Sequence, residues 1–204
     1  DVLQQERQLR EAIASNAFVL HYQPQICLAD GSLKGFEALV RWQHPERGLL
    51  GPDKFITFSE SRGLITPIGR WVMHEACRQL KAWQDEGLAM VPVAVNLSAL
   101  EFRQRDVAGE LAAVLHATGL EPRFLEIELT ESVLMHHTGQ VLETLNAIKA
   151  LGVGVTIDDF GTGYSSLAYL KRYPIDKLKI DRSFVMDTPQ SADDVAIVTA
   201  IIQM

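Results

Sequence analysis

The sequence has 204 residues, of which 47% are hydrophobic and 22% are charged, a composition typical of one soluble globular domain. Its formal net charge of −7, without a cluster of lysines and arginines, argues against a polymeric nucleic-acid partner, because phosphate backbones require basic surfaces. It contains neither a run of ~18 to 20 apolar residues nor a signal-peptide pattern, so we expect a cytoplasmic domain without direct membrane insertion. Its only two cysteines, Cys27 and Cys77, lack the spacing of a metal site.

Residues 1–15 show apolar side chains at helical spacing, which predicts a helix or linker that continues from an upstream domain. The strand patterns 18–28 and 33–42 flank the turn 29–32 and predict a hairpin. Beyond the hairpin, helices are expected at 51–63, 66–87, 106–119, 138–152, 165–173 and from about 191, and strands at 91–97, 124–129, 153–158 and 176–180.

The regular alternation of strands and helices after the hairpin predicts an α/β fold with a parallel sheet and right-handed crossovers. Such a pattern fits either a doubly wound sheet or a (β/α)8 barrel. Six strands are recognisable, two fewer than a closed barrel needs. We assign residues 16–204 to this one domain and expect its C-terminal strands to be absent from the chain.

A polar side chain recurs near the C-terminal end of five strands, on the face opposite the apolar residues: Glu37, Asn96, Glu128, Asp158 and Lys179. In a barrel these strand ends converge on one mouth, where active sites of that fold lie. Carboxylates and an amide together need a cation, and an all-oxygen set suits Mg²⁺, Mn²⁺ or Ca²⁺. Asp158 is placed to bridge two metals, with Asp159 reaching the second, as in phosphodiester hydrolysis.

Each of these positions, taken alone, fits equally well a helix cap or a bond to loop backbone. Asp159, close to Gly161, also fits a turn. His44 and the pair at 136–137 are interpreted as surface or loop residues, since they lack partners at metal-ligand spacing. The Gly-Thr-Gly segment at 161–163 lacks the remaining residues of a phosphate-binding loop and predicts a flexible loop.

Several segments together resemble one family, the EAL domain of cyclic di-GMP phosphodiesterases. These segments are FEALVRW (36–42), VNLS (95–98), EIELTES (126–132), DDFGTGYSSLAYL (158–170) and LKIDRSFV (178–185), supported by YQP (22–24), HPERG (44–48) and GLITPIGRWVM (63–73). They occur in order and cover nearly the whole chain. The resemblance implies a modified (β/α)8 barrel whose first strand is antiparallel, in agreement with the predicted hairpin.

The resemblance also implies hydrolysis of cyclic di-GMP to linear pGpG with Mg²⁺ or Mn²⁺, and inhibition by Ca²⁺. In that scheme the metal ligands are Glu37, Asn96, Glu128, Asp158 and Asp159, and Lys179 holds or deprotonates the attacking water. Two nearby cations would disfavour the lysine's ammonium form. The scheme assigns Glu131 as the anchor of the loop that begins at Asp159, and Gln23, Arg41 and Asp181 as substrate contacts, with Asp181 also supporting Lys179.

The resemblance further implies a homodimer, coupled to the metal site through that loop and the helix after it, and an upstream regulatory domain. The chain would then be cytoplasmic, or the cytoplasmic part of a larger membrane-anchored protein. The chain departs from the family where it lacks the EGVE-type and QGY-type segments of the last two strands. Alternatives are an inactive EAL module that acts as a cyclic di-GMP receptor or protein-interaction domain, and an enolase-like barrel metalloenzyme. Intact metal-ligand positions favour the enzyme.

Overall fold

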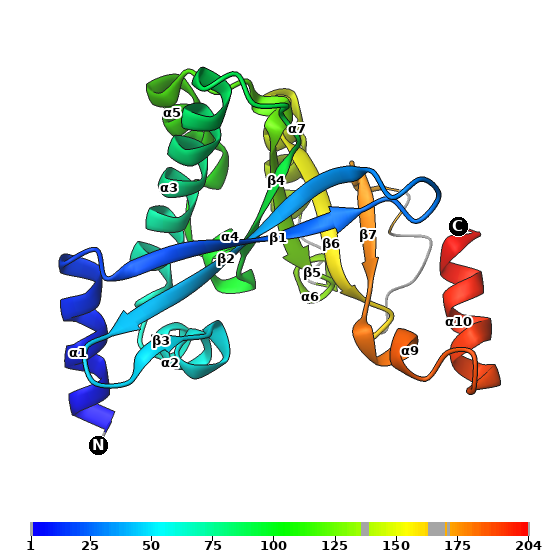
Figure 1. Ribbon diagram of the computed structural model, residues 1–204, viewed down its shortest axis with the longest axis horizontal. Coiled ribbons are helices and arrows are strands. Elements are labelled where there is room, and N and C mark those ends of the chain that lie inside the picture. Colours follow the sequence, from blue (N-terminus) through cyan, green and yellow to red (C-terminus); the bar gives the residue numbers. More distant parts are fainter. Residues whose placement is uncertain (1, 136–138, 163–169, 171, 204) are drawn as a thin grey trace.

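The computed structural model describes residues 2–135, 139–162, 170 and 172–203. Its centre is one seven-stranded sheet in the order β1-β2-β4-β5-β6-β7, with the short β3 paired to β2 (Figure 1). The strands are β1 (Phe18–Ile26), β2 (Leu33–His44), β3 (Gly48–Leu50), β4 (Val93–Leu97), β5 (Leu125–Thr130), β6 (Gly154–Phe160) and β7 (Lys177–Ile180). All six predicted strands are present, and β3 is an addition.

Strands β1 and β2 form the predicted antiparallel hairpin, and every later pairing along the main path is parallel. The sheet curves, but in the described part of the chain β1 and β7 stay unpaired with each other as its two ends. The fold is therefore an open, partial α/β barrel with an antiparallel first strand, as predicted.

The helices are α1 (Val2–Ala14), α2 (Ile56–Ser61), α3 (Ile65–Asp85), α4 (Ala99–Gln104), α5 (Val107–Thr118), α6 (Ser132–Met135), α7 (Gly139–Ala150), α9 (Arg182–Met186) and α10 (Ala192–Ile202), with 3₁₀ turns at Pro52–Lys54 and Pro122–Phe124. The short helices α4, α6 and α9 were not predicted, because fewer than two turns show no periodicity. The helix predicted at 165–173 lies mostly outside the described residues. None of the described helices combines the length and apolar character required to span a bilayer.

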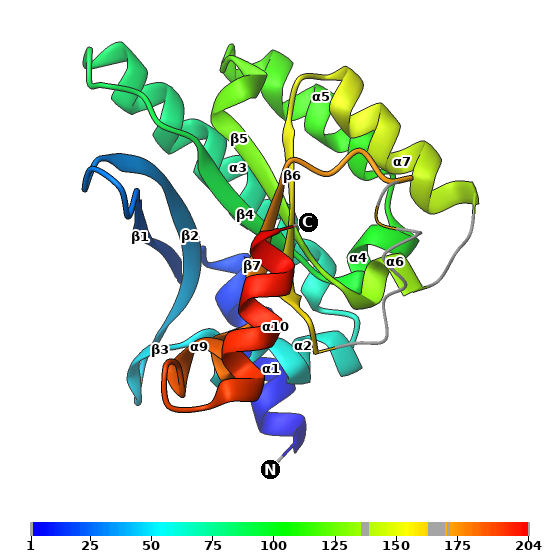
Figure 2. The same cartoon turned by 90° about the vertical axis from the view of Figure 1, so that its right-hand side faces the viewer.

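Helices α3, α5 and α7 lie along one face of the curved sheet (Figure 2). The strand residues that face them form the core, as β5 illustrates: Leu125, Ile127 and Leu129 are at most 1% exposed. Burying each such side chain contributes roughly 1.5–3 kcal/mol. The alternate residues of β5, Glu126 and Glu128, therefore point to the opposite, inner face of the partial barrel.

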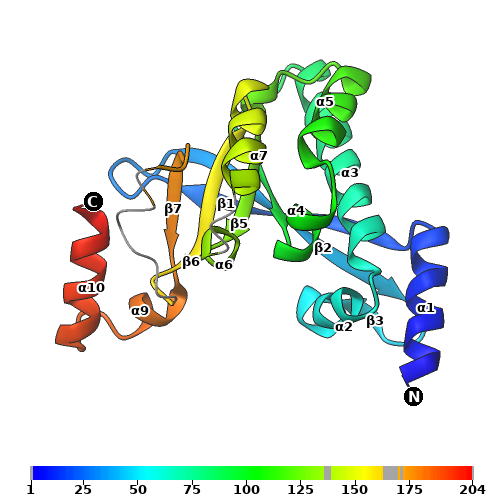
Figure 3. The same ribbon diagram turned by 180° about the vertical axis from the view of Figure 1, so that it is seen from behind.

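The first helix is part of the same packed structure, since Leu9 and Ala12 of α1 belong to the hydrophobic core. Seen from behind, α1 and α10 lie at opposite ends of the molecule, α10 beside β7 (Figure 3). Cys77 is fully buried, whereas Cys27 in the hairpin is partly exposed. The interpretation of residues 1–15 as a linker from another domain stays a prediction.

Candidate metal centre at the strand ends

The register of the parallel strands places the predicted polar side chains side by side. Asn96 of β4 is paired with Glu128 of β5. Glu37 of β2 is paired with Ala94, which lies two residues before Asn96 and on the same face of β4. On β6, Asp158 lies opposite Thr130, two residues beyond Glu128. Residues that share a face of neighbouring strands have their side chains within contact distance, so the curved sheet gathers them at one place.

Three carboxylates meet at this place. One oxygen from each of Glu37, Glu128 and Asp158 lies within 4.8 Å of the others. Lys179 of β7 is placed among them: its Nζ donates to Glu128 Oε2 at 2.8 Å and Glu37 Oε2 at 2.9 Å, and lies 3.3 Å from Asp158 Oδ2. Lys179 is the only cationic partner of Glu128 and Asp158 among the ion pairs of the described residues.

The residues present fit a divalent metal. Asn96 Nδ2 donates to Glu37 Oε1 at 2.7 Å, which leaves the amide oxygen of Asn96 available as a ligand. Glu128 is 1% exposed, and its Oε1 is buried without a hydrogen-bond partner in the described structure. A buried carboxylate oxygen without a partner is costly unless it binds something. All the available donor atoms are oxygens, the set that Mg²⁺ and Mn²⁺ prefer.

Electrostatics at the centre is governed first by burial, and then by Lys179 and the neighbouring carboxylates. Burial, together with the charges of Glu37 and Asp158, raises the pKa of Glu128 to about 7, although Lys179 acts against this shift. Burial would lower the pKa of Lys179, but its bonds to Glu128 and Glu37 outweigh burial and raise it. The ammonium form is thus favoured in this arrangement, the opposite of the shift expected beside two cations.

Asp159 lies just beyond this group of three carboxylates. Its backbone has a φ of 54°, in the left-handed region that side chains other than glycine rarely adopt. Burial and the nearby charges of Asp158 and Asp181 raise the pKa of Asp159. Asp181 in turn caps α9: its Oδ1 accepts from the backbone N–H of Ser183 at 2.8 Å. Among the described residues, the side-chain hydrogen bonds of Asp181 run to Ser183 and Asp159, and its predicted roles in supporting Lys179 and contacting the substrate stay predictions.

Glu131, the residue after β5, contacts the start of the loop that follows Asp159. It is 4% exposed, and its Oε2 accepts a hydrogen bond from the backbone N–H of Gly161 at 3.1 Å. Its own N–H donates to the carbonyl of Asp158 at 3.3 Å. Glu131 thereby holds both sides of the strained Asp159 turn. The rest of the loop, residues 163–169, and the histidine pair at 136–137 lie outside the described residues.

The two other predicted substrate contacts lie on the hairpin. Gln23 is exposed and pairs with Glu37, so it borders the metal centre. Arg41 lies four residues after Glu37, on the same face of β2, and its Nη1 donates to the Val40 carbonyl at 3.0 Å. A cavity of about 460 Å³ opens next to the centre, lined among others by Leu39, Asp53, Ile56, Ile68, Asn96 and Thr130.

His44 is a correction to the sequence interpretation. It is buried rather than on the surface, with 5% exposure, and its ring lies 4.8 Å from that of Trp42. Its Nδ1 accepts the backbone N–H groups of Glu46 and Arg47 at 3.1 and 3.2 Å. The ring therefore closes the tight turn between β2 and β3, which is a local structural role that residue spacing alone does not reveal.

Sequence reasoning also missed a set of charged residues behind Asn96, centred on Arg105 and Glu101. One signal was available: Ser98 and Glu101 have the S-x-x-E spacing of a capping box. Glu101 and Arg105 also have the i,i+4 spacing of a helical ion pair, whereas the second partner of Arg105, Glu110, lies on the next helix, α5.

Comparison with known families gives one extensive match: the model of the EAL domain matches residues 6–204. Among curated proteins, the chain is 48% identical over 202 residues to the cyclic di-GMP phosphodiesterase NbdA of Pseudomonas aeruginosa, covering 99% of this chain and 26% of NbdA. It is 42% identical to the cyclic di-GMP phosphodiesterase PdeR of Escherichia coli, covering 95% of this chain and 29% of PdeR. The chain thus spans about a quarter of the length of these relatives.

Solved structures agree with this match. The phosphodiesterase PaMucR in complex with c-di-GMP superposes with a TM-score of 0.93 at 46% identity, covering 98% of this chain and 81% of that one. The FimX EAL domain of Xanthomonas citri, also in complex with c-di-GMP, gives a TM-score of 0.87 at 27% identity, covering 98% and 78%.

Proposed function

This chain belongs to the EAL domain family, and from that premise we propose that it hydrolyses one phosphodiester bond of cyclic di-GMP to give linear pGpG. The observation that carries the proposal is the meeting of Glu37, Glu128 and Asp158 within 4.8 Å beside Asn96. Phosphodiester hydrolysis requires neutralisation of phosphate charge and an activated water. A receptor needs no such cluster of metal ligands.

We assign Glu37, Asn96, Glu128 and Asp158 as ligands of the metal centre, with Asp159 serving a second Mg²⁺ or Mn²⁺. When bound, the two cations would supply an acidified water and neutralise the charge that develops on the phosphate. The unpartnered Oε1 of Glu128 supports direct ligation by this residue. Asp159 is supported by its position next to Asp158 and by the strain of its backbone, which functional sites often store.

Lys179 has the role of holding the attacking water. Its ion pairs keep the ammonium at the point where the carboxylates converge. Glu37 and Glu128 use two of its three N–H donors, so the third is the donor that would hold a water on the phosphate. Any transfer of the water's proton to Lys179 requires the neutral amine, which the present contacts disfavour. Gln23 and Arg41 would bind the polar edges and phosphates of the substrate, and the adjoining cavity would receive part of the nucleotide.

Turnover of cyclic di-GMP by the full-length protein, followed as pGpG by chromatography, tests the proposal. We expect product with Mg²⁺ or Mn²⁺ and suppression by Ca²⁺. Glu37→Gln should abolish turnover, whereas Glu11→Gln, a matched change on the exposed surface of α1, should not. Tight binding of cyclic di-GMP without product, under all three metals, would refute hydrolysis and make the domain a receptor. A homodimer and an upstream regulatory domain complete the proposal.

A further inference from the structure

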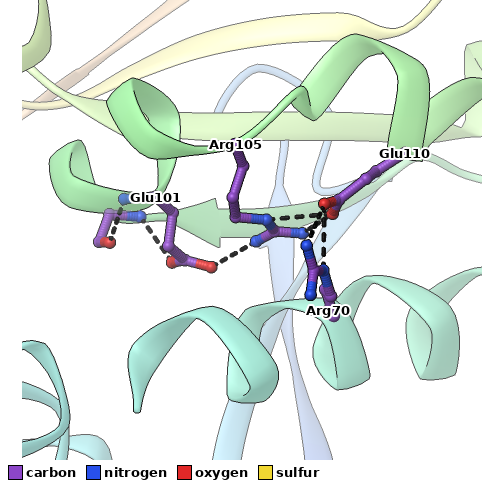
Figure 4. Close-up of polar contacts among 5 residues, drawn as sticks. Arg70, Glu101, Arg105 and Glu110 are labelled. Atoms are coloured by element: carbon purple, nitrogen blue, oxygen red, sulfur yellow. Dashed lines mark hydrogen bonds and ion pairs between the residues drawn. The ribbon is translucent and has the colours of Figure 1, made fainter. Parts of the chain in front are cut away.

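A series of charged side chains, Glu101, Arg105, Glu110 and Arg70, connects α4, α5 and α3 (Figure 4). Arg105, at the end of α4, donates to Glu101 Oε1 at 2.5 Å and forms two bonds to Glu110 Oε2 of α5. Glu110 Oε1 then accepts from Arg70 of α3 at 2.8 and 3.0 Å. The side chains of Arg105 and Glu101 are each 2% exposed, whereas that of Arg70 is 55% exposed.

One end of this series is the capping box of α4. Ser98 Oγ accepts the backbone N–H of Glu101, and Glu101 Oε2 accepts the backbone N–H of Ser98, both at 3.2 Å. Ser98 comes two residues after Asn96, and Leu97 between them is buried. The Glu101 carboxylate therefore holds the backbone N–H of Ser98, the first residue after β4.

Glu101 has no freedom to move because both its oxygens are used and a helix lies against it. One oxygen accepts from Ser98 and the other from Arg105. On its remaining side is Gly69 of α3, where an added Cβ would lie only 1.8 Å from Glu101 Oε1 and 3.1 Å from Arg105 Nη1. The close approach of α3 requires glycine at this position, and it clamps the carboxylate between α3 and α4.

A buried ion network is weak evidence for stability, since desolvation offsets most of its attraction. Its geometry is informative, however. The bonds from the Ser98 N–H and from Arg105 Nη1 give the capping carboxylate of Glu101 a fixed direction, and the fork of Arg105 is in turn held by Glu110. Glu101, Ser98 and Gly69 also line the cavity that reaches Asn96. The network thus lines the same cavity as Asn96, one of the proposed ligands of the metal centre.

We infer that Arg105 is a positioning residue for this centre: through Glu101 and Ser98 it fixes the turn after β4 and so the amide of Asn96. The inference rests on the proposed metal-dependent function. Outer groups that orient metal ligands typically affect metal affinity by 10–100-fold. Because Asn96 is one ligand of several, we expect effects near the lower end of that range.

The test is Mn²⁺ affinity of the full-length protein, measured by titration calorimetry without substrate and well below the unfolding temperature of every variant. Gly69→Ala displaces Glu101 without removing a charge, and Arg105→Lys keeps the charge but loses the fork. Each should weaken Mn²⁺ binding about 10-fold. Glu101→Gln, which keeps an acceptor for Ser98, should weaken it less and serves if the others fail to fold.

Matched controls separate positioning from general destabilisation. Gly139→Ala adds a Cβ that meets nothing within 4 Å, and Arg78→Lys changes an exposed bidentate pair with Glu75; neither should alter Mn²⁺ affinity. Glu37→Gln is the benchmark for loss of a ligand. If it weakens binding while the folded network variants bind like wild type, the positioning inference is wrong and the metal centre stands. If Glu37→Gln also binds like wild type, both proposals fail.

Discussion

Replacing Lys179 by methionine removes the cation that separates Glu37, Glu128 and Asp158. Methionine fills a similar volume, so the loss is mainly electrostatic. Removing one partner of a buried charge pair costs about 3–5 kcal/mol, because the remaining charge is left uncompensated. The Lys179 side chain is 30% exposed, so we take the lower value, about 3 kcal/mol. For a domain of this size, that lowers the unfolding temperature by about 6–12 °C without added metal.

Divalent metal should reverse much of this loss, since a cation bound among the carboxylates replaces the missing charge. A metal present at 100 times its dissociation constant stabilises the folded state by about 2.7 kcal/mol. We therefore expect Mg²⁺ or Mn²⁺ to raise the unfolding temperature of Lys179→Met more than that of wild type. Calorimetric unfolding with and without metal, in EDTA-treated protein, measures both effects.

The neighbouring Lys177→Met is the matched control. Lys177 lies on the same face of β7 and pairs with a single carboxylate, Glu126, at 2.6 Å, with its side chain 45% exposed. The variant leaves one carboxylate, 9% exposed, without its cation, so its unfolding temperature should also fall, but its metal response should match wild type because Glu126 is outside the group of three carboxylates. Equal unfolding temperatures for Lys179→Met and wild type in EDTA would refute the view that Lys179 neutralises the three carboxylates.

Three further predictions concern the turn and the network. Burial would raise the pKa of Glu110, but Arg105 and Arg70 outweigh it and lower this pKa to about 2. The ionised Glu110 therefore contributes to folding stability above pH ~4.5, and this contribution is lost as the pH falls towards 2. Over this interval, urea unfolding should show that wild type loses about 2–3 kcal/mol more stability than Glu110→Gln. Glu131→Ala removes the acceptor of the Gly161 N–H and should weaken the response of turnover to Mg²⁺; an unchanged Mg²⁺ titration would contradict the anchoring role. Asp159→Gly relieves a left-handed backbone and should stabilise the fold by about 1 kcal/mol while turnover falls, so a stable variant that remains fully active would remove Asp159 from the site.

Much of the site was predictable because strand geometry is periodic. Side chains alternate between the two faces of a strand, so Glu126 and Glu128 of EIELTE, and Thr156 and Asp158 of VTIDD, had to face away from the helices that cover Leu125 and Ile127. Short elements were the weak point. Helix α4 has only six residues, and β3 has three, too few for a hydrophobic period to appear.

The histidines and the arginines show where local reasoning stops. His44 is buried because the turn from β2 to β3 folds its backbone N–H groups onto the ring, a contact set by the path of the chain rather than by composition. Arg105 gains its role from Glu110 of α5 and from the absence of a side chain at Gly69 of α3. Such partners are invisible until the helices are packed.

The sequence by itself determined the order of strands and helices, the inner face of each strand and the residue types at the strand ends, because these depend on near neighbours in the chain. The tertiary structure decided which of them meet. Glu37 and Lys179 are 142 residues apart, yet the curvature of the sheet brings their charged atoms to 2.9 Å. Only that curvature gives Lys179 three carboxylate partners and, among the described residues, leaves Glu128 Oε1 buried without a hydrogen-bond partner.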